Sequence, residues 1–109
     1  MPTSKNYFEL PLESTELVAL IRKCEKGERK SQQDLYKQFF GYAMGVSLRY
    51  SQSRDEAVEI LNLGFFKVLT QLNKYNRELS FRGWMRRIMV NSAIDYYRRS
   101  KRHQHLDIS

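Results

Sequence analysis

The sequence predicts an all-α fold, a compact bundle of about four helices joined by short connections. Both prolines, Pro2 and Pro11, lie before residue 12, so proline interrupts no later helix. Beyond them, apolar residues recur three, four and seven positions apart in four separate stretches, which is the spacing of one helix face. No stretch of useful length shows the alternation of apolar and polar residues that indicates a strand. The chain has 109 residues, the size of one domain.

The two ends of the chain are predicted to lie outside the folded part. Residues 1–12 contain both prolines, and we expect them to form a mobile arm. Residues 104–109 follow the last helical pattern, and we expect a disordered tail or the start of a linker there. The helical domain is therefore predicted to span residues 13–103.

The first helix is expected to begin near Ser14 or Thr15, with Ser14 as its cap. Its apolar face is predicted to contain Leu17, Leu20, Ile21 and Cys24. Gly27 suits the end of this helix, because glycine readily adopts the left-handed conformation that often terminates helices.

The second helix is predicted to run from about Glu28 to Tyr50. Its inward face is predicted to comprise Leu35, Phe39, Tyr42, Ala43, Val46 and Tyr50. Gly41 and Gly45 each lower the helix propensity by about 1 kcal/mol relative to alanine. We expect that they allow another helix to approach closely at these two positions.

The third helix is predicted to span about Arg54 to Asn73, with Ser53 as its cap. Two acidic residues in its first turn, Asp55 and Glu56, match the positive end of the helix dipole. Six residues form its predicted inward stripe: Ala57, Leu61, Gly64, Phe65, Val68 and Leu72.

The fourth helix is expected from about Phe81 to Arg102, after a polar, turn-rich segment at residues 74–80. Ser80 is positioned to cap this helix. Five of its residues are predicted to face the same way: Met85, Ile88, Met89, Ser92 and Tyr96.

The positive charge of the chain is concentrated on the fourth helix. The chain carries 19 Lys and Arg against 12 Asp and Glu, a net charge of +7. Residues 82–102 include seven basic residues and one acid, Asp95, which leaves +6 on this helix. The basic residues are Arg82, Arg86, Arg87, Arg98, Arg99, Lys101 and Arg102. One basic helix on a nearly neutral bundle favours binding to nucleic-acid phosphates, although a solvated face with arginines stabilised by the helix dipole is the alternative.

One polar stripe of the fourth helix combines Asn91, Asp95, Arg98 and Arg102. Asp95 is expected to pair with Arg98 or Arg99 on the same helix. The Asn91 amide both donates and accepts hydrogen bonds, as the reading of a base edge requires.

Three aromatic residues, Tyr75, Phe81 and Trp84, lie at or just before the start of this helix. Aromatic rings beside arginines often serve as stacking platforms for unpaired bases. The alternative is a position in the core, which we expect for Phe81 and Trp84. Tyr75 lies in the polar segment and is therefore the candidate for base stacking.

No arrangement of residues indicates catalysis or metal binding, so we expect neither enzymatic activity nor a cofactor. His103 and His105 are the only histidines, and apart from Asp107 no metal-binding side chain lies near them in the sequence. Glu56 and Glu59 are interpreted as a solvated acidic edge. The sequence contains no P-loop, dinucleotide-binding or nucleophile-elbow motif.

The composition also indicates where the protein works. Cys24 is the single cysteine, which excludes a disulfide framework and suits a reducing compartment. No apolar run approaches the roughly 20 residues of a membrane span, and the N-terminus has no apolar signal core. We therefore expect a cytoplasmic protein without membrane insertion.

Three segments together resemble a known family: DLYKQFFGYAMGVSLRY (34–50), SRDEAVEILNLGFFKVL (53–69) and SFRGWMRRIMVNSAIDYYRRSKRH (80–103). The most specific feature is the order Phe, Trp, Ile, Asn, Asp and Arg at positions 81, 84, 88, 91, 95 and 98. These segments are similar to region 2, also called domain 2, of bacterial RNA polymerase sigma factors of the extracytoplasmic-function (ECF) group in the sigma-70 family. The resemblance covers about residues 14–103.

The resemblance implies an all-α domain that docks on the β′ clamp helices of the RNA polymerase core and that recognises and melts the −10 promoter element. The implied polymerase contacts are Glu59, Asn62, Leu63, Phe66 and Lys67. The implied DNA contacts are Tyr75, Asn76, Ser80, Arg82, Arg86, Arg87, Asn91, Arg98, Arg99 and Arg102. Among them, Tyr75, Asn91 and the 74–80 segment are expected to capture one base of the non-template strand.

The sequence departs from the family pattern in two ways. The family usually carries an acidic residue at the position of Leu63, so we expect weaker docking on polymerase here. The family also carries a helix-turn-helix domain, region 4, which is not present within these 109 residues, so we expect the domain alone to bind promoters poorly. Two alternative functions are a protein-interaction module bound mainly by an anti-sigma protein and a general basic nucleic-acid binder unrelated to polymerase.

Overall fold

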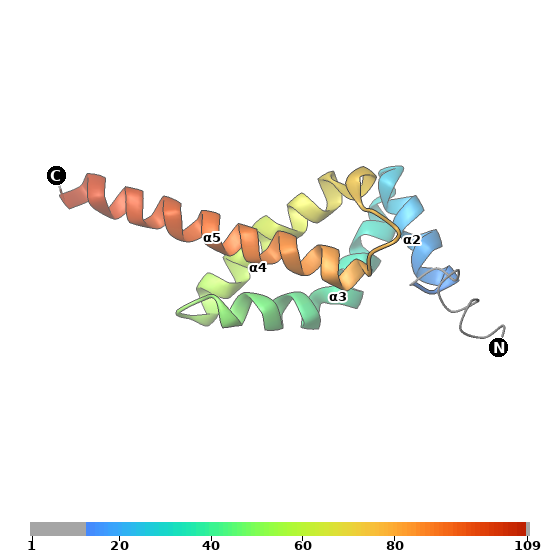
Figure 1. Cartoon of the computed structure of the whole chain (residues 1–109), viewed down its shortest axis with the longest axis horizontal. Helices are drawn as coiled ribbons and strands as arrows, with labels where there is room; N and C mark the ends of the chain where they lie inside the picture. Colours follow the sequence, from blue (N-terminus) through green and yellow to red (C-terminus); the bar gives the residue numbers. More distant parts are fainter. Residues whose placement is uncertain (1–12, 109) are drawn as a thin grey trace.

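The computed structural model describes residues 13–108, with side chains for residues 13–101, and this part of the chain is helical without a strand. Its elements are α2 (Thr15–Glu25), α3 (Arg29–Arg49), α4 (Arg54–Thr70), the 3-10 helix η1 (Leu72–Lys74) and α5 (Phe81–Ile108). α4 packs against both α3 and α5, and α2 packs against α3 (Figure 1). The predicted all-α bundle is confirmed for the described residues.

The predicted caps explain where helices begin and end. Ser14 Oγ accepts a hydrogen bond from the Leu17 N–H (3.1 Å) at the start of α2. Ser53 Oγ accepts one from the Glu56 N–H (3.1 Å) at the start of α4. Gly27 has a φ of 85°, and this left-handed conformation ends α2 as predicted.

The core lies where the apolar stripes of the helices meet. All six residues of the predicted α4 stripe are buried: Ala57, Leu61, Gly64, Phe65, Val68 and Leu72. Ile60 is buried as well, because α4 is covered by α3 on one side and by α5 on the other and so buries more than one stripe. Tyr50, predicted to face inward, is 37% exposed because α3 ends at Arg49 and Tyr50 leaves the helical stripe.

Of the glycines in the described residues, Gly64 is the one that another helix approaches closely, and the expectation for Gly41 and Gly45 is wrong. A Cβ atom at Gly64 would lie 2.5 Å from Met89 Sδ and 3.3 Å from Ser92 Oγ, both on α5. A Cβ atom at Gly41 or Gly45 would meet nothing within 4 Å, because both positions are exposed on α3. The crossing of α4 and α5 therefore depends on the missing side chain of Gly64.

α5 is longer than predicted and projects beyond the other helices (Figure 1). It continues past Arg102 to Ile108, because no proline or glycine follows Gly83 to interrupt it. The predicted arm at residues 1–12, the last residue of the predicted tail and the side chains of Arg102, His103 and His105 lie outside the described residues.

Candidate nucleic-acid and protein interfaces

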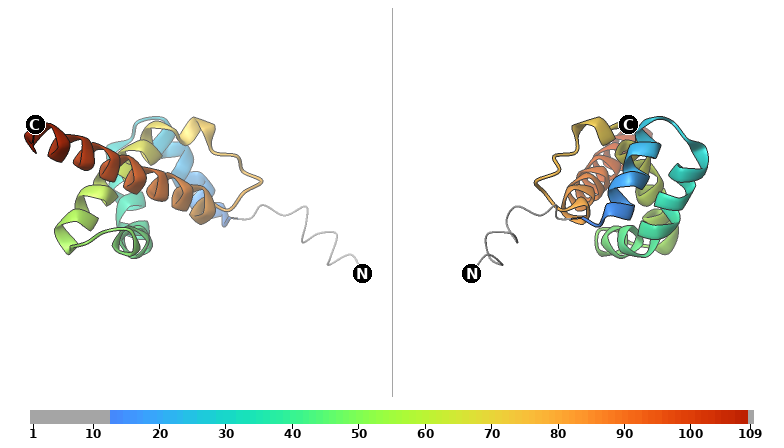
Figure 2. Two further views of the ribbon diagram at one scale, coloured as in Figure 1. Left: turned by 60° about the vertical axis from the view of Figure 1, so that its left-hand side comes forward. Right: turned by 90° about the vertical axis from the view of Figure 1, so that its right-hand side faces the viewer.

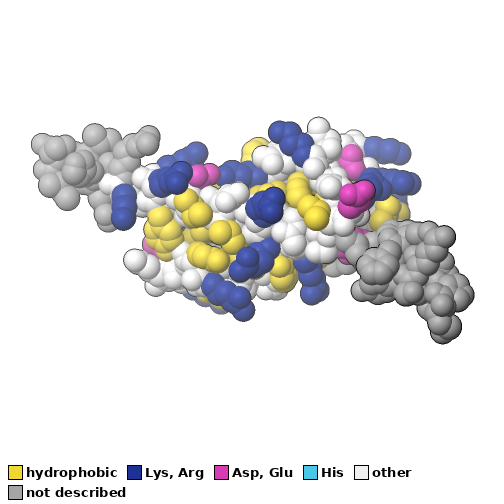
Figure 3. Space-filling model, in the orientation of Figure 1, with side chains coloured by type: hydrophobic (Ala, Val, Ile, Leu, Met, Phe, Trp, Pro, Cys, Tyr) yellow, Lys and Arg dark blue, Asp and Glu magenta, His cyan; other side chains and the backbone are white. Residues whose placement is uncertain are grey.

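α5 presents its arginines to solvent. The exposed ones are Arg82, Arg86, Arg87, Arg98 and Arg99. In Figure 3, basic side chains are spread over most of the described part of this face, and acidic side chains are few. The predicted basic surface is therefore accessible to an anionic ligand such as a phosphate chain.

Arg82, the first arginine of α5, is held over an aromatic ring. Its guanidinium carbon lies 5.3 Å from the centre of the Tyr42 ring on α3. The Tyr42 hydroxyl also donates a hydrogen bond to the Arg82 carbonyl oxygen (3.3 Å). Because a cation is attracted to the negative face of a ring, α3 helps to set the direction of this side chain.

Tyr75, Phe81 and Trp84 form one aromatic cluster at the start of α5. The Tyr75 ring centre lies 5.2 Å from that of Phe81 and 5.3 Å from that of Trp84. Phe81 is fully buried, as predicted, and Trp84 packs against the core while remaining half-buried. Tyr75 is half-buried too, so its ring is partly packed and partly accessible.

The loop from Tyr75 to Ser80 is held by its own hydrogen bonds, and Figure 2 shows it running along the edge of the bundle into α5. The Tyr75 hydroxyl donates to the Leu79 carbonyl oxygen (2.7 Å), and the Glu78 N–H donates to Asn76 Oδ1 (3.0 Å). Ser80 Oγ accepts a hydrogen bond from a backbone N–H in the first turn of α5 (3.0 Å). The Asn76 and Ser80 side chains, both candidate DNA contacts, therefore also shape the loop.

Asn91 is exposed on α5, at some distance from this loop. Ten residues separate it from Phe81, which at a rise of about 1.5 Å per residue places the two about 15 Å apart along the helix axis. Tyr75 packs against both Phe81 and Trp84, and Trp84 lies seven residues, about 10 Å along the axis, before Asn91. The aromatic cluster and Asn91 are therefore two to three helical turns apart along α5.

Four of the five candidate polymerase contacts lie together on the outer surface of α4. Glu59, Asn62, Leu63 and Phe66 line one open hollow of about 420 Å³, which we call the α4 face. Phe66 is 67% exposed and Leu63 is 41% exposed. Asn62 Oδ1 accepts a hydrogen bond from the Tyr36 hydroxyl on α3 (3.0 Å). A phenylalanine this exposed beside a second apolar side chain favours a protein partner.

Lys67, the fifth candidate, points toward α5 instead. Its Nζ lies 3.1 Å from Asp95 Oδ2, and both side chains are partly buried. The expected pairing of Asp95 with Arg98 or Arg99 is therefore not what the structure contains. The packing of α4 on α5 brings Lys67 to the carboxylate, while the two arginines extend into solvent.

Glu56 is joined to α5 by a tyrosine hydroxyl rather than simply solvated, whereas Glu59 is exposed as expected. The Glu56 carboxylate accepts hydrogen bonds from the Tyr97 hydroxyl (2.6 Å) and from the Gln52 N–H (2.9 Å). Donation by Tyr97, and then by Gln52, lowers the pKa of Glu56, and the same bond raises the pKa of Tyr97 to about 12. The nearby Glu59 carboxylate likewise raises the pKa of Tyr96.

Replacing Tyr97 with phenylalanine should raise the pKa of Glu56 and weaken the acid dependence of stability. The pKa of Glu56 is lower in the folded chain than in the unfolded one, so its contribution is present above the unfolded pKa of about 4.3 and is lost as the pH falls through the folded value. NMR titration of the Glu56 carboxyl and thermal melts at pH 7 and pH 3 measure both effects. Tyr50→Phe, at an exposed tyrosine, is the control. Equal acid sensitivity of the wild type and Tyr97→Phe would contradict the assignment.

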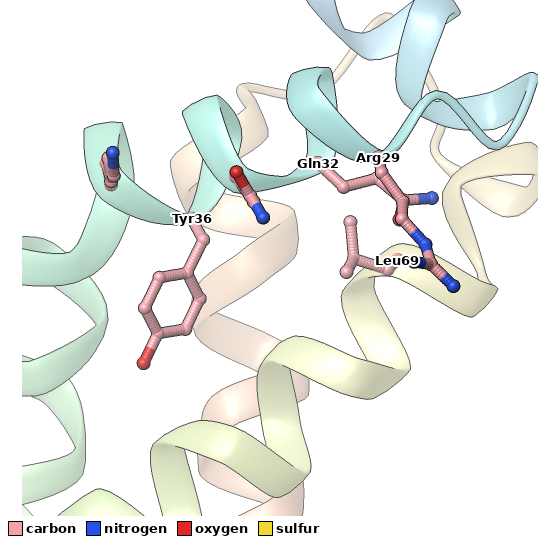
Figure 4. Close-up of a pocket in the computed structure, with 6 residues that line it drawn as sticks. Arg29, Gln32, Tyr36 and Leu69 are labelled. Atoms are coloured by element: carbon pink, nitrogen blue, oxygen red, sulfur yellow. The ribbon is translucent and has the colours of Figure 1, made fainter.

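A second hollow, of about 310 Å³, lies between α3 and α4 (Figure 4). It is lined by Arg29, Gln32, Gln33, Tyr36, Lys37 and Leu69. Two of these side chains are held in place: Gln32 Nε2 donates to the Cys24 carbonyl oxygen (3.2 Å), and the Tyr36 ring packs edge-on against Phe65 (5.0 Å). None of the DNA or polymerase contacts predicted from the sequence lines this hollow. The α3 side of the hollow carries no signal in the sequence, because it has the composition of an ordinary solvated helix face.

The described side chains contain no group of three or more His, Cys, Asp or Glu residues that could hold a metal ion. Cys24 is buried, and burial raises the pKa of its thiol to about 11, so the sulfur is protonated and poorly nucleophilic at neutral pH. Among the described helices, none combines the length and the apolar character that crossing a membrane requires.

Comparison with known proteins identifies the family. Residues 35–103 match Sigma-70 region 2, a span that includes α4, the aromatic loop and most of α5. The chain belongs to the Sigma-70 region 2 family. The resemblance seen in the sequence is thereby confirmed.

Two relatives are full-length sigma factors. The ECF RNA polymerase sigma-E factor of Haemophilus influenzae is 27% identical over 78 residues, which cover 72% of this chain and 41% of that protein. RNA polymerase sigma factor YlaC of Bacillus subtilis is 28% identical over 81 residues, which cover 74% of this chain and 47% of that protein. The region 2 chain thus spans a little under half the length of these relatives.

A solved structure shares the region 2 fold. An engineered region 2 of sigmaE, in complex with GTAAAA, matches with a TM-score of 0.71 and 25% identity. The match covers 84% of this chain and 97% of the other. It agrees with the all-α bundle described above and with the family assignment.

Proposed function

We propose that this domain is part of a cytoplasmic sigma factor, that it docks on core RNA polymerase, and that it binds and helps to melt the −10 promoter element without catalysing a reaction. The observation that carries this proposal is α5, a basic helix that begins at an aromatic loop, in a fold shared with a region 2 solved in complex with GTAAAA. Exposed arginines and partly accessible rings can hold a single strand without any catalytic group.

The non-template strand is placed along the loop and α5. One base stacks on the accessible part of Tyr75, a second nucleotide lies at Asn91, and the exposed arginines contact the phosphates. Because Tyr75 packs on Phe81 and Trp84 near the start of α5 and Asn91 lies two to three helical turns further on, we assign Tyr75 and Asn91 to different nucleotides rather than to one shared base. Aromatic stacking contributes about 1–3 kcal/mol per base, which offsets the few kcal/mol needed to unstack a base from the duplex.

Binding to single-stranded DNA should depend steeply on salt. If four arginines neutralise phosphates of a single strand, the plot of log affinity against log salt concentration should have a slope of about −3. Arg98→Gln and Arg99→Gln should each reduce the magnitude of the slope by about 0.7. Lys23→Gln, an exposed position on α2, should leave the slope unchanged. A wild-type slope near zero would contradict the electrostatic account and favour a protein-interaction module.

Core RNA polymerase is assigned to the α4 face. This face lies on a different helix from the proposed DNA surface, so polymerase and DNA can be bound together. Phe66 and Leu63 supply an apolar centre, and Glu59 and Asn62 supply a polar margin, an arrangement common in protein interfaces. We assign an anti-sigma protein, the partner in the alternative function given above, to the same face, where it would compete with polymerase.

Phe66→Ala should weaken binding to core polymerase by about tenfold, the loss expected when one central aromatic contact is removed. Leu63→Glu should strengthen it, because it restores the acidic residue that the family usually carries there. Stability should hardly change in either variant, since both side chains are exposed. Leu48→Ala, at a similarly exposed position on α3, is the control. Unchanged affinity in Phe66→Ala, measured by titration of labelled domain with core enzyme, would remove the α4 face from the docking surface.

A further inference from the structure

The start of α5 is capped by a side chain that is far away in the sequence. The Phe81 N–H donates a hydrogen bond to Glu13 Oε2 at 2.7 Å, although 68 positions separate the two residues. Glu13 directly precedes Ser14, whose hydroxyl caps α2. The pair Glu13–Ser14 therefore joins the starts of two helices, and a carboxylate occupies the positive end of the α5 dipole.

The same carboxylate lies beside the aromatic loop. Burial is the main cause of the raised pKa of Tyr75, and the negative charge of Glu13 is the next. Phe81, which donates its N–H to Glu13, follows the loop directly. Its ring centre lies 5.2 Å from that of Tyr75. Glu13 thus fixes the point at which the loop ends and the helix begins.

A free helix N-terminus attracts phosphates without regard to sequence, because its unpaired N–H groups and its dipole favour any anion. At the start of α5, the Phe81 N–H already donates a hydrogen bond to Glu13, and the Gly83 N–H donates one to Ser80 Oγ (3.0 Å). The backbone N–H groups at the start of α5 are therefore less available to a phosphate than the exposed arginine side chains. A strand that approaches the loop is then held by its bases and by arginines such as Arg82, and not by these N–H groups.

We propose that Glu13 is a positioning residue for promoter recognition: its carboxylate fixes the loop against α5 and keeps phosphates off the backbone N–H group at the start of the helix, so that the loop selects bases. This inference rests on the proposed function, because it assumes that the loop contacts the −10 strand. It adds a residue outside the region 2 match, which begins at residue 35. The sequence offers no signal for Glu13, because it lies next to the predicted arm and far from the loop.

The first test measures the hydrogen bond between Glu13 and the Phe81 N–H directly, without DNA. In Glu13→Ala, the Phe81 amide should exchange with solvent at least tenfold faster, and NMR signals of residues 75–80 should shift. In Glu13→Gln, which keeps an accepting oxygen, both effects should be small. Glu16→Ala, at an exposed acid in the first turn of α2, removes the same charge and should leave Phe81 unaffected. Unchanged Phe81 exchange in Glu13→Ala would overturn the proposal, whatever the DNA results are.

The second test measures selectivity on the hexanucleotide GTAAAA and on its single-base variants. Glu13→Ala should reduce the preference among these strands about tenfold while its affinity for the least preferred strand stays equal or rises. Glu13→Gln should keep the preference within about twofold of the wild type. If Glu13→Ala lowered the affinity for every strand equally and also lowered the thermal stability, Glu13 would be a structural cap without a role in base selection. A wild type without any preference on the panel, combined with intact Phe81 protection, would instead contradict the proposed base reading by the loop and, with it, the selectivity assigned to Glu13.

Discussion

Replacing Gly64 with alanine should destabilise the domain by up to about 2 kcal/mol, because forcing an extra group into a packed core costs about 1–3 kcal/mol and the higher helix propensity of alanine offsets about 1 kcal/mol of this. The new Cβ atom would lie 2.5 Å from Met89 Sδ, well inside contact distance. Met89 is fully buried, so its sulfur has little room to move away. α4 and α5 must then separate slightly at their crossing. Chemical denaturation followed by circular dichroism measures the loss of stability.

Gly45→Ala is a matched control with the opposite sign. Gly45 is exposed in the interior of α3, and an added Cβ atom would meet nothing within 4 Å. Alanine there should stabilise the helix by about 1 kcal/mol through its higher propensity. If Gly64→Ala stabilised the domain as much as Gly45→Ala does, the tight crossing of α4 and α5 would not exist in solution. The double variant Gly64→Ala, Met89→Ala shortens the facing side chain. It should lose less stability than the sum of the losses in the two single variants.

The contrast between these glycines shows what the sequence could predict about the fold. Helix existence, caps and most inward stripes follow from local rules, and Ser14, Ser53 and Gly27 act as those rules predict. Periodicity shows that a residue faces inward, but it does not show which helix comes closest to it. Gly64 was predicted in the inward stripe of α4, while the close approach was assigned to the two glycines of α3, where none occurs.

The same limit applies to the polar contacts around the candidate site. The concentration of charge on α5 follows from the sequence, and four of the five polymerase contacts that the resemblance implies lie together on the α4 face. The Lys67–Asp95 ion pair joins residues 28 positions apart, and the Tyr97–Glu56 hydrogen bond joins residues 41 positions apart. Such pairs form because packed helices bring the side chains together, so local spacing favoured the wrong partners for Asp95 and a solvated role for Glu56.

Tyr75→Ala should weaken binding to a −10-like single strand about ten- to hundredfold, since stacking contributes about 1–3 kcal/mol per base. Tyr75 also packs on Phe81 and Trp84, and its hydroxyl donates to the Leu79 carbonyl oxygen, so alanine will loosen the loop as well. Tyr75→Phe separates the two effects, because it keeps the ring and removes only the hydrogen bond. It should bind almost as the wild type does. A loss in Tyr75→Phe as large as that in Tyr75→Ala would mean that the loop conformation, rather than stacking, controls affinity.

Asn91→Ala should act differently, by flattening the preference between bases at one position with a smaller loss of overall affinity. The amide of Asn91 offers both a donor and an acceptor, and the side chain is exposed, about 10 Å along α5 from Trp84 and about 15 Å from Phe81. The position that loses its preference should therefore differ from the one at which Tyr75→Ala acts. Both variants can be measured on GTAAAA and its single-base substitutions. If Asn91→Ala lowers the affinity for every strand alike, Asn91 contributes to binding without reading a base, and base selection must then come from the loop.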